Sequence, residues 1–455
     1  MVSGTQTPAA LLFKREGALV LALGLLGALL LALAVAAPWI ERAFGYGVLV
    51  PLIAASGLVT IAATMLAPAV PVRAGLLVIL GVGVALRLVL VADPPLFSTD
   101  IYRYVWDGRV QGAGINPYRY VPADAALAAL RDADIYPNIN RADYAPTAYP
   151  PVAQMFFFLV TRLSQSLTAM RLALIGCEVV VVALLLDLLR TLRLPATAVV
   201  AWVWHPLPLW EIANNGHIDA LMVALAVLGL WLLVRARRYA GVVAVAAAVA
   251  VKPYAAVLLP LFQRRWDWRV PLLAAAVLLA CYLPYLGAGR RVFGFLASGY
   301  LAEEGLTDGG GFWLTGLVQA VAGDVPGLVP LYVAAAGAVL AWLALRVAPE
   351  PVPSPRRIVA GAALLMMAGL FFLSPNYAWY FLAVVPFLVL CGPGPFAVPA
   401  WAMTLGAFLL YRPVFLPDND LVWKTLATLP FVIAVLAVLV RGRRIFNLEA
   451  TPWPN

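Results

Sequence analysis

Residues 72–91, VRAGLLVILGVGVALRLVLV, form one of the long apolar runs that dominate this chain of 455 residues. The run contains only two charged side chains, Arg73 and Arg87. A helix of about 20 residues rises about 30 Å, which is the thickness of the hydrocarbon core of a bilayer. The run therefore predicts a helix that crosses a membrane.

The composition extends this interpretation to the whole chain. Hydrophobic residues make up 64% of it and charged residues 12%, whereas a soluble domain carries roughly 25% charged residues. Because lipid cannot satisfy open backbone groups, apolar runs of about 16 to 22 residues predict helices and not barrel strands. We expect an all-α polytopic membrane protein with about 11 to 14 transmembrane or re-entrant helices, folded as a single membrane domain over residues 1–455.

Further apolar runs fit a hydropathy window of about 19 residues. Together with the run above, the predicted spans are residues 17–37, 48–67, 72–91, 170–190, 196–212, 218–234, 270–287, 326–346, 357–373, 377–391, 396–411 and 420–440. Residues 151–166 fit less well and predict a short hairpin arm that dips into the membrane. Residues 240–262 are interrupted by Lys252-Pro253 and predict a broken re-entrant pair, because proline disfavours helix in the residue before it.

The arginines explain the formal net charge of +9 without a nucleic-acid partner, because they cluster in short connections between spans. The clusters are Arg73; Arg190 and Arg193; Arg235, Arg237 and Arg238; Arg264, Arg265 and Arg269; Arg346, Arg356 and Arg357; and Arg441, Arg443 and Arg444. All fall on the cytoplasmic side if the N-terminus is cytoplasmic and if residues 151–166 and 240–262 each enter and leave the membrane on the same side. This topology places both termini in the cytoplasm.

Four segments with polar content then face the opposite side of the membrane. The longest, residues 93–150, holds seven aspartates and no glutamate. The others are residues 214–219, residues 288–312 and the turn at 374–377. Because the cytoplasmic connections are short and basic, we expect the chemistry of the protein to lie on this outer face.

Within the long loop, residues 100–111 have helical periodicity and predict an amphipathic helix on the membrane surface, with Ser98 or Asp100 as its cap. Residues 123–132 predict a second helix. The loop is also rich in tyrosine, including Tyr102 and Tyr149. Such rings serve as interfacial anchors or stack on a sugar, and the sequence leaves both roles open.

Several motifs make the chain recognisable as similar to a family. They are STDIYRYVWDGRV at residues 98–110, GINPY at 114–118, YPP at 149–151, WHPL at 204–207, NGHIDA at 215–220 and KPY at 252–254. In order and spacing they resemble the bacterial GT-C membrane glycosyltransferases, above all the polyprenyl-phosphomannose-dependent mannosyltransferases of actinobacterial envelopes. One departure is NYAWY at residues 376–380, where the resemblance leads us to expect a His-Pro-Trp-Tyr type motif.

The resemblance implies an inverting glycosyltransferase of a bacterial cytoplasmic membrane. It would move a hexose, most simply mannose, from a polyprenyl-phosphate donor to a lipid-linked or envelope glycan acceptor on the extracytoplasmic face. Asp100 matches the family's catalytic acidic position, and a carboxylate within about 3 Å of the acceptor hydroxyl can take its proton. The alternative role for Asp100 is helix capping.

The leaving phosphate needs cations. Lys252 is one candidate, because a charge inside an apolar segment is costly and usually functional, although it could instead snorkel to an interface. Arg103 and Arg109 are further candidates, and Asp107 could bind sugar hydroxyls. Salt bridges among these three residues are the alternative.

Other residues are candidates for substrate contact. His217, one of two histidines in the chain, lies in a polar turn and is either a substrate ligand or a structural residue. The remaining candidates are Tyr102, Asn116, Tyr149, Asn215, Asp219, Asn376 and Tyr380. We expect no metal and no cofactor, since neither zinc-ligand spacing nor a phosphate-binding glycine loop occurs.

A lipid-linked sugar flippase or solute transporter is the rival function. Its support is the intramembrane Lys252 beside a broken helix, a feature that transporters also use. The concentration of polar residues on one side of the membrane argues for the enzyme.

Overall fold

The computed structural model describes residues 8–264, 267–348, 353–392, 394–412 and 419–441, and all regular structure in them is helical. Within these described ranges, eight helices are long and apolar enough to cross a membrane. The expected fold class, an all-α polytopic membrane protein, is confirmed. The chain termini, Arg265, Arg443 and Arg444 lie outside the described residues, so the orientation in the membrane stays a prediction.

The α-helices of the structure vary widely in length. They are α1 (Pro8–Phe44), α2 (Tyr46–Leu66), α3 (Val72–Ala92), α4 (Asp100–Gly112), α5 (Pro151–Leu163), α6 (Leu167–Leu192), α7 (Val200–Val203), α8 (Asp219–Val234), α9 (Arg238–Val249), α10 (Arg269–Tyr282), α11 (Leu301–Glu303), α12 (Trp313–Ala322), α13 (Leu328–Val347), α14 (Pro355–Leu373), α15 (Val385–Leu390), α16 (Ala397–Gly406) and α17 (Asp420–Val440). Tighter or wider helical segments connect them: η1 (Ala67–Ala69), η2 (Ala125–Leu130), η3 (Tyr136–Asn138), η4 (Ala196–Val199), η5 (Pro208–Asn214), η6 (Pro253–Phe262), η7 (Leu283–Phe293), η8 (Leu296–Tyr300), η9 (Ala378–Val384) and η10 (Ala407–Tyr411).

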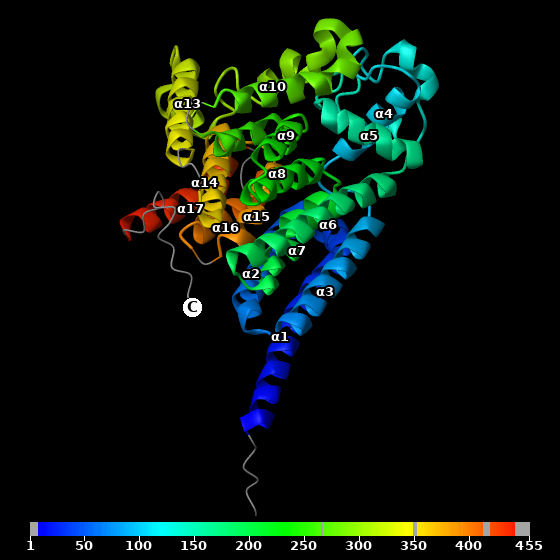
Figure 1. The fold of residues 1–455 in the computed structure, drawn as a ribbon. Helices are drawn as coiled ribbons and strands as arrows, with labels where there is room; N and C mark the ends of the chain where they lie inside the picture. The colour runs from blue at the N-terminus through cyan, green and yellow to red at the C-terminus, as the bar shows by residue number, and fades with distance from the viewer. Residues whose placement is uncertain (1–7, 265–266, 349–352, 393, 413–418, 442–455) are drawn as a thin grey trace, which may run out of the picture.

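The long N-terminal helix α1 packs against α2 and α3 and extends to one end of the molecule. At the opposite end lie α4 and α5, which pack against each other and against α6, while α10 runs across that same end (Figure 1). The long polar segment of residues 93–150, to which α4 belongs, is therefore remote from the N-terminal tip of α1.

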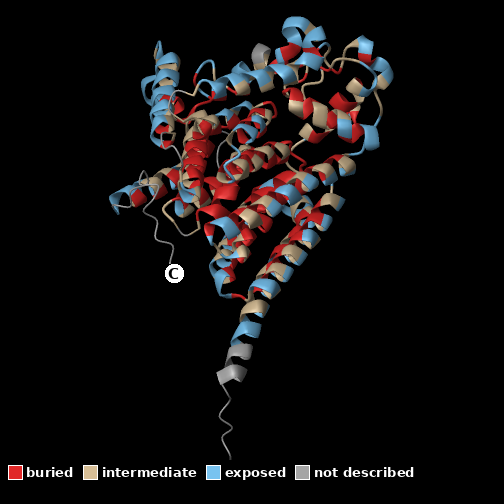
Figure 2. Ribbon diagram, in the orientation of Figure 1, coloured by how far each residue is buried: buried red, intermediate tan, exposed pale blue. Residues whose placement is uncertain are grey.

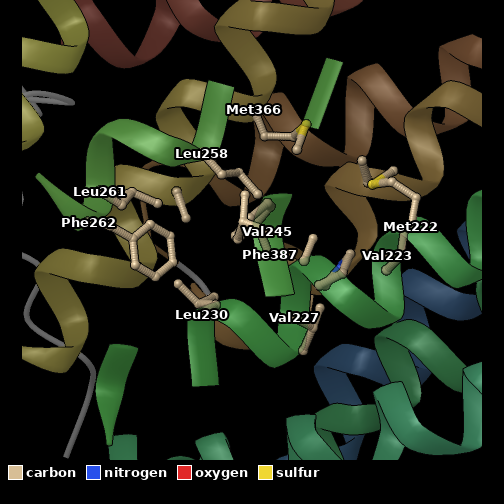
Figure 3. Close-up of a pocket in the computed structure, with 14 residues that line it drawn as sticks. Met222, Val223, Val227, Leu230, Val245, Leu258, Leu261, Phe262, Met366 and Phe387 are labelled. Atoms are coloured by element: carbon tan, nitrogen blue, oxygen red, sulfur yellow. The ribbon is translucent and has the colours of Figure 1, made fainter. Parts of the chain in front are cut away.

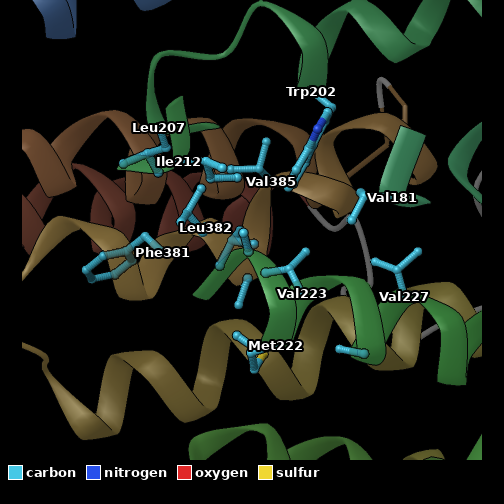
Figure 4. Packing of buried hydrophobic residues seen from close by; sticks show 14 of the residues in the cluster. Val181, Trp202, Leu207, Ile212, Met222, Val223, Val227, Phe381, Leu382 and Val385 are labelled. Carbon is cyan, nitrogen blue, oxygen red and sulfur yellow. The ribbon is translucent and has the colours of Figure 1, made fainter. Parts of the chain in front are cut away.

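Buried residues concentrate where α7, α8, α14 and α15 meet (Figure 2). Side chains from α6, α7, α8, η9 and α15 interlock there, with Trp202, Met222 and Val385 among them (Figure 4). The outward faces of α1, α3 and α10 instead expose large apolar side chains such as Leu25, Leu77 and Leu279. Exposed leucines on long apolar helices are expected where lipid is the solvent.

Four of the twelve predicted spans are not long continuous helices. Residues 196–212 divide into η4, α7 and the wide helical segment η5, with a break at Trp204–His205. The break directly precedes Pro206, which lacks a backbone donor and disfavours helix in the residue before it. Residues 218–234, 377–391 and 396–411 also form shorter apolar segments, which are α8, the pair η9 and α15, and the pair α16 and η10.

The predictions for residues 240–262 and for residues 151–166 have different outcomes. The break at Lys252-Pro253 is confirmed, because α9 ends at Val249 and η6 begins at Pro253. Within residues 151–166, Pro151–Leu163 forms the single helix α5, and its dip into the membrane stays a prediction. It lies so close to α4 that a Cβ on Gly108 would stand 2.4 Å from the carbonyl oxygen of Phe157.

The predicted helix at residues 100–111 exists as α4, but other helices cover much of its surface. Residues of α4 on several faces are buried, among them Ile101, Arg103, Trp106 and Val110. The packing of α5 and α6 against α4 accounts for this burial. The second predicted helix, residues 123–132, is reduced to the short 3₁₀ segment η2.

Candidate active site

A cavity of about 720 Å³ opens where the predicted outer segments converge. Its walls come from the start of α4, the loop before α5, the break between α9 and η6, the segment around η8 and α11, and the turn after α14. Residues 93–150, 288–312 and 374–377 all contribute lining residues. The fourth segment, 214–219, lies directly behind the cavity, because Asn214 Nδ2 donates to the carbonyl oxygen of Pro94 at 3.0 Å.

Asp100 begins α4 and lines this cavity, with its side chain 13% exposed. Its Oδ1 accepts a hydrogen bond from Asn140 Nδ2 at 2.5 Å. The N-cap position belongs to Thr99, which makes no side-chain cap hydrogen bond. Ser98 Oγ instead accepts from the backbone N–H of Asp100 at 3.2 Å. The carboxylate of Asp100 is therefore not engaged in capping and faces the cavity.

Lys252 reaches the same cavity from the break in the α9–η6 pair. Its backbone is extended, with φ −141° and ψ 116°, as expected for a residue before proline. Its Nζ lies 3.2 Å from Asp219 Oδ2, and 5.0 Å and 5.9 Å from the ring centres of Tyr380 and Tyr149. One cation is thus held between a carboxylate and two aromatic faces, an arrangement that supports charge in a poorly solvated place.

Tyrosines and amides complete the wall around Lys252. Tyr254 Oη donates to Asp219 Oδ1 at 3.0 Å, and the hydroxyls of Tyr300 and Tyr380 are 2.8 Å apart. Asn376 Nδ2 donates to Glu304 Oε2 at 2.6 Å. Burial, together with the negative charge of Asp100, raises the pKa of Tyr149 well above its ordinary value. The Tyr149 hydroxyl therefore stays protonated at neutral pH.

His217 and Asn215 stand behind the cavity and support its wall. The imidazole of His217 is fully buried and stacks on Trp379, with ring centres 4.0 Å apart. Asn215 Oδ1 accepts from the backbone N–H groups of Leu96 and Phe97, at 3.2 Å and 2.9 Å. Asn215 therefore fixes the segment that leads into Asp100.

The structure brings Asp100, Tyr149, Lys252, Asn376 and Tyr380 to the cavity wall and Asp219 against Lys252. The other candidates do not line it.

Arg103 Nε pairs with Asp107 Oδ1 at 2.7 Å inside the packing of α4. Asp107 Oδ2 also accepts from Gln154 Nε2 at 2.9 Å, so this pair is internal.

Arg109 and Asn116 are likewise occupied by protein contacts. Arg109 Nη2 lies 2.6 Å from Asp132 Oδ2. Burial alone raises the pKa of Asp132, but the hydrogen bonds from Arg109 and the backbone lower it to about 2. Asn116 Nδ2 donates to the carbonyl oxygen of Tyr285 at 2.9 Å. Tyr102 is half-buried against the apolar core, outside the cavity lining.

Sequence reasoning missed Asn140, Arg141 and Tyr300. Arg141 Nε donates to Glu303 Oε1 at 2.5 Å, which joins the long loop to α11 across the cavity rim. Burial lowers the pKa of Arg141, but the hydrogen bond with Glu303 and the charge of Asp100 outweigh it and raise the pKa overall. No motif in the sequence marks Arg141.

A second hollow, between α8, α9, η6, α14 and α15, is too small and too apolar for this chemistry. It measures about 20 Å³, and its lining includes Met222, Leu258, Phe262 and Phe387 (Figure 3). It is a packing gap of the core.

The described residues contain eight candidate membrane helices and a large cavity lined by a carboxylate and a largely buried ammonium group. These features define a membrane protein with a site suited to group transfer. Residues 16–269 match the family described as alpha-(1->6)-mannopyranosyltransferase, N-terminal domain. The chain therefore belongs to this family, and the resemblance seen in its motifs is confirmed. Asp100, His217, Asp219 and Lys252 fall within the matched residues, whereas Asn376 and Tyr380 lie beyond them.

One curated relative agrees with this assignment. Alpha-(1->6)-mannopyranosyltransferase A of Mycobacterium tuberculosis is 31% identical over 186 residues, which are 39% of this chain and 34% of the relative. The match thus spans about a third of the relative's length. No solved structure matches the chain significantly.

Proposed function

We propose that the protein is a membrane mannosyltransferase that moves mannose from a polyprenyl-phosphate donor to a hydroxyl of a lipid-linked or envelope glycan. The observation that carries the proposal is the presence of Asp100 and Lys252 on the wall of one cavity. A base for the acceptor and a cation for the leaving group are the two charges that this reaction needs. The family and the relative's name support mannose as the sugar and an α-(1→6) linkage.

In this mechanism Asp100 accepts the proton of the attacking hydroxyl. The acceptor oxygen forms a bond to the anomeric carbon while the bond from that carbon to the phosphate oxygen breaks. Lys252 and Tyr380 stabilise the charge that develops on the phosphate. Direct displacement from the face opposite the phosphate inverts the anomeric centre.

The proposed side of the membrane is the extracytoplasmic face of a bacterial cytoplasmic membrane. It follows from the basic clusters, which positive-inside topology places opposite the cavity. The polyprenyl chain would lie among the apolar helices, with the phosphosugar under residues 93–150. Lys252 serves as the cation, so the proposal needs no cofactor.

Transfer of labelled mannose from synthetic polyprenyl-phosphomannose by the purified protein tests the function. Asp100→Asn should lower kcat by about 10²- to 10⁴-fold, the usual contribution of a general base. Asp134→Asn is the matched control, because Asp134 is an exposed aspartate of the same loop outside the cavity lining. Equal activity of wild type and Asp100→Asn would remove Asp100 from the mechanism.

Lys252→Met should raise the donor KM and lower kcat. Lys252→Arg should change the donor KM and kcat less, because the positive charge is kept. Unchanged donor affinity in Lys252→Met would contradict the phosphate role. The same preparation in vesicles separates the rival function: translocation of the labelled lipid without transfer of mannose would identify a flippase.

A further inference from the structure

We propose that His217 accepts from Asp100 the proton of the acceptor hydroxyl and that Glu211 stabilises the imidazolium so formed. The inference rests on the proposed function and adds a second proton carrier to it. His217 would act through Asp100, as a positioning residue that does not itself touch the substrate.

The first support is the placement of the ring between two carboxylates. His217 Nδ1 lies 4.0 Å from Asp100 Oδ2, and His217 Nε2 lies 3.4 Å from Glu211 Oε2. The imidazole is fully buried, and neither ring nitrogen has a hydrogen-bond partner within the described part of the chain. Two unsatisfied nitrogens in a sealed site are costly unless they serve the reaction.

Both carboxyl oxygens of Glu211 accept hydrogen bonds. Its Oε1 accepts from Tyr411 Oη at 2.7 Å, and its Oε2 accepts from Asn215 Nδ2 at 3.1 Å. These two donors favour the carboxylate form, against the complete burial of the side chain, which favours the neutral acid. Carboxylates face both ring nitrogens, and the nearer one, Glu211 at 3.4 Å from Nε2 against Asp100 at 4.0 Å from Nδ1, places the single N–H of a neutral imidazole on Nε2. The lone pair of Nδ1 then points toward Asp100.

This tautomer gives the proton a path. Asp100 Oδ1 is already held by Asn140, so Oδ2 is the oxygen nearer to His217. When Asp100 has taken the hydroxyl proton, Oδ2–H can donate to Nδ1, and the gap of 4.0 Å closes by a small side-chain rotation. Hydrogen bonds of this kind are often long before substrate binds. Transfer to Nδ1 restores the Asp100 carboxylate and forms an imidazolium that Glu211 stabilises.

Ring stacking and a backbone hydrogen bond fix the position of His217, and neither contact involves a ring nitrogen. His217 stacks on Trp379, which in turn stacks on Tyr377 at 4.4 Å. The backbone N–H of His217 donates to the carbonyl oxygen of Glu211 at 2.8 Å. The charged groups that act on the ring are Asp100, Glu211 and Lys252. Lys252 opposes an imidazolium, but its own charge is paired with Asp219.

The test is His217→Gln, which keeps a polar side chain but cannot carry a proton. We expect kcat for mannose transfer to fall about 100-fold, within the range for general acid–base groups, while the donor KM changes less than about 3-fold. The pH at which kcat is half-maximal should move by about one unit or more, because coupled groups titrate together. A residue that only filled space would not move this pH.

The chain supplies a matched control in its other histidine. His205 is also fully buried and also stacks on a tryptophan, Trp401, but it contacts Thr404 and not the cavity. His205→Gln should keep the wild-type kcat and pH profile in protein of equal thermal stability.

The outcomes separate the two proposals. A folded His217→Gln protein with wild-type kcat and pH profile, beside an inactive Asp100→Asn protein, would overturn the relay and leave the glycosyltransferase function standing. An active Asp100→Asn protein would instead contradict the proposed function itself. If His217→Gln does not fold, Glu211→Gln decides: the relay expects a displaced pH profile and a lower kcat, and an unchanged profile overturns it.

Discussion

Lys252 Nζ lies 3.2 Å from Asp219 Oδ2, and the Asp219 side chain is completely buried. Removing one partner of such a pair leaves an uncompensated charge, at a cost of about 3–5 kcal/mol, whereas replacing both by apolar groups is often neutral. We therefore predict that Asp219→Leu lowers the thermal stability of the detergent-solubilised protein markedly. The double variant Asp219→Leu/Lys252→Met should regain most of that stability and remain inactive in mannose transfer.

The double variant distinguishes charge pairing from packing. If it is as unstable as Asp219→Leu, the loss comes from the shape of the Asp219 side chain and not from the orphaned ammonium group of Lys252.

The ion pair of Arg103 and Asp107 leads to a second prediction. Their side chains are only 5% and 2% exposed, and the sequence had suggested both as substrate ligands. Because the pair is internal, Asp107→Leu should destabilise the fold by about 3–5 kcal/mol and leave the donor KM of the surviving protein within about 2-fold of wild type. A donor KM that rises as it does in Lys252→Met would place Asp107 in the substrate site after all.

The Lys252–Asp219 and Arg103–Asp107 pairs show how much of the candidate site the sequence predicts. Hydropathy located the spans, and Pro253 marked the break that brings Lys252 to the cavity. The motif around Asp100 located one wall. The sequence could not show that α4 is covered by α5 and α6, because an amphipathic period fits a lipid surface and a protein surface equally well. That burial turned Arg103 and Asp107 into partners of each other.

The missed residues were hidden for a different reason. Asn140 lies 40 residues and Tyr300 lies 200 residues from Asp100 in the chain, and neither segment has a periodicity or motif of its own. Their place on the cavity wall results from the path of the long loop and of η8 over the helices. Only tertiary packing determines that path.

A third prediction concerns the contact of Arg141 with Glu303 across the cavity rim. Both side chains are partly exposed, at 22% and 31%, so Glu303→Gln should change stability by no more than about 1 kcal/mol. It should nevertheless raise the KM for the donor or the acceptor about 3- to 10-fold, because the two walls of the cavity are no longer joined. Moderate salt should have a similar effect on the wild-type enzyme, since exposed pairs are screened.

The charge-reversed double variant Arg141→Glu/Glu303→Arg provides the control for this rim contact. Recovery of the wild-type KM in the double variant would show that pairing matters. If KM stays high in the double variant and in Glu303→Gln alike, Glu303 acts on the substrate directly.

The last prediction concerns Gly216, which lies between Asn215 and His217 with a φ of +74°. A Cβ at this position would stand 2.5 Å from Ile101 Cδ1 and 3.2 Å from Arg171 Cγ, and Ile101 directly follows Asp100. Gly216→Ala should therefore cause both backbone strain at positive φ, which costs about 1 kcal/mol, and a steric displacement at the catalytic end of α4.

Gly114→Ala isolates the effect of backbone strain, because Gly114 has a φ of +77° and open space around its Cβ position. We expect Gly114→Ala to lower stability slightly and to transfer mannose normally, whereas Gly216→Ala should lower stability further and reduce kcat at least 10-fold, since it moves Asp100 relative to His217. Equal effects of the two substitutions on stability and kcat would mean that the wall behind Asp100 yields to the added methyl group.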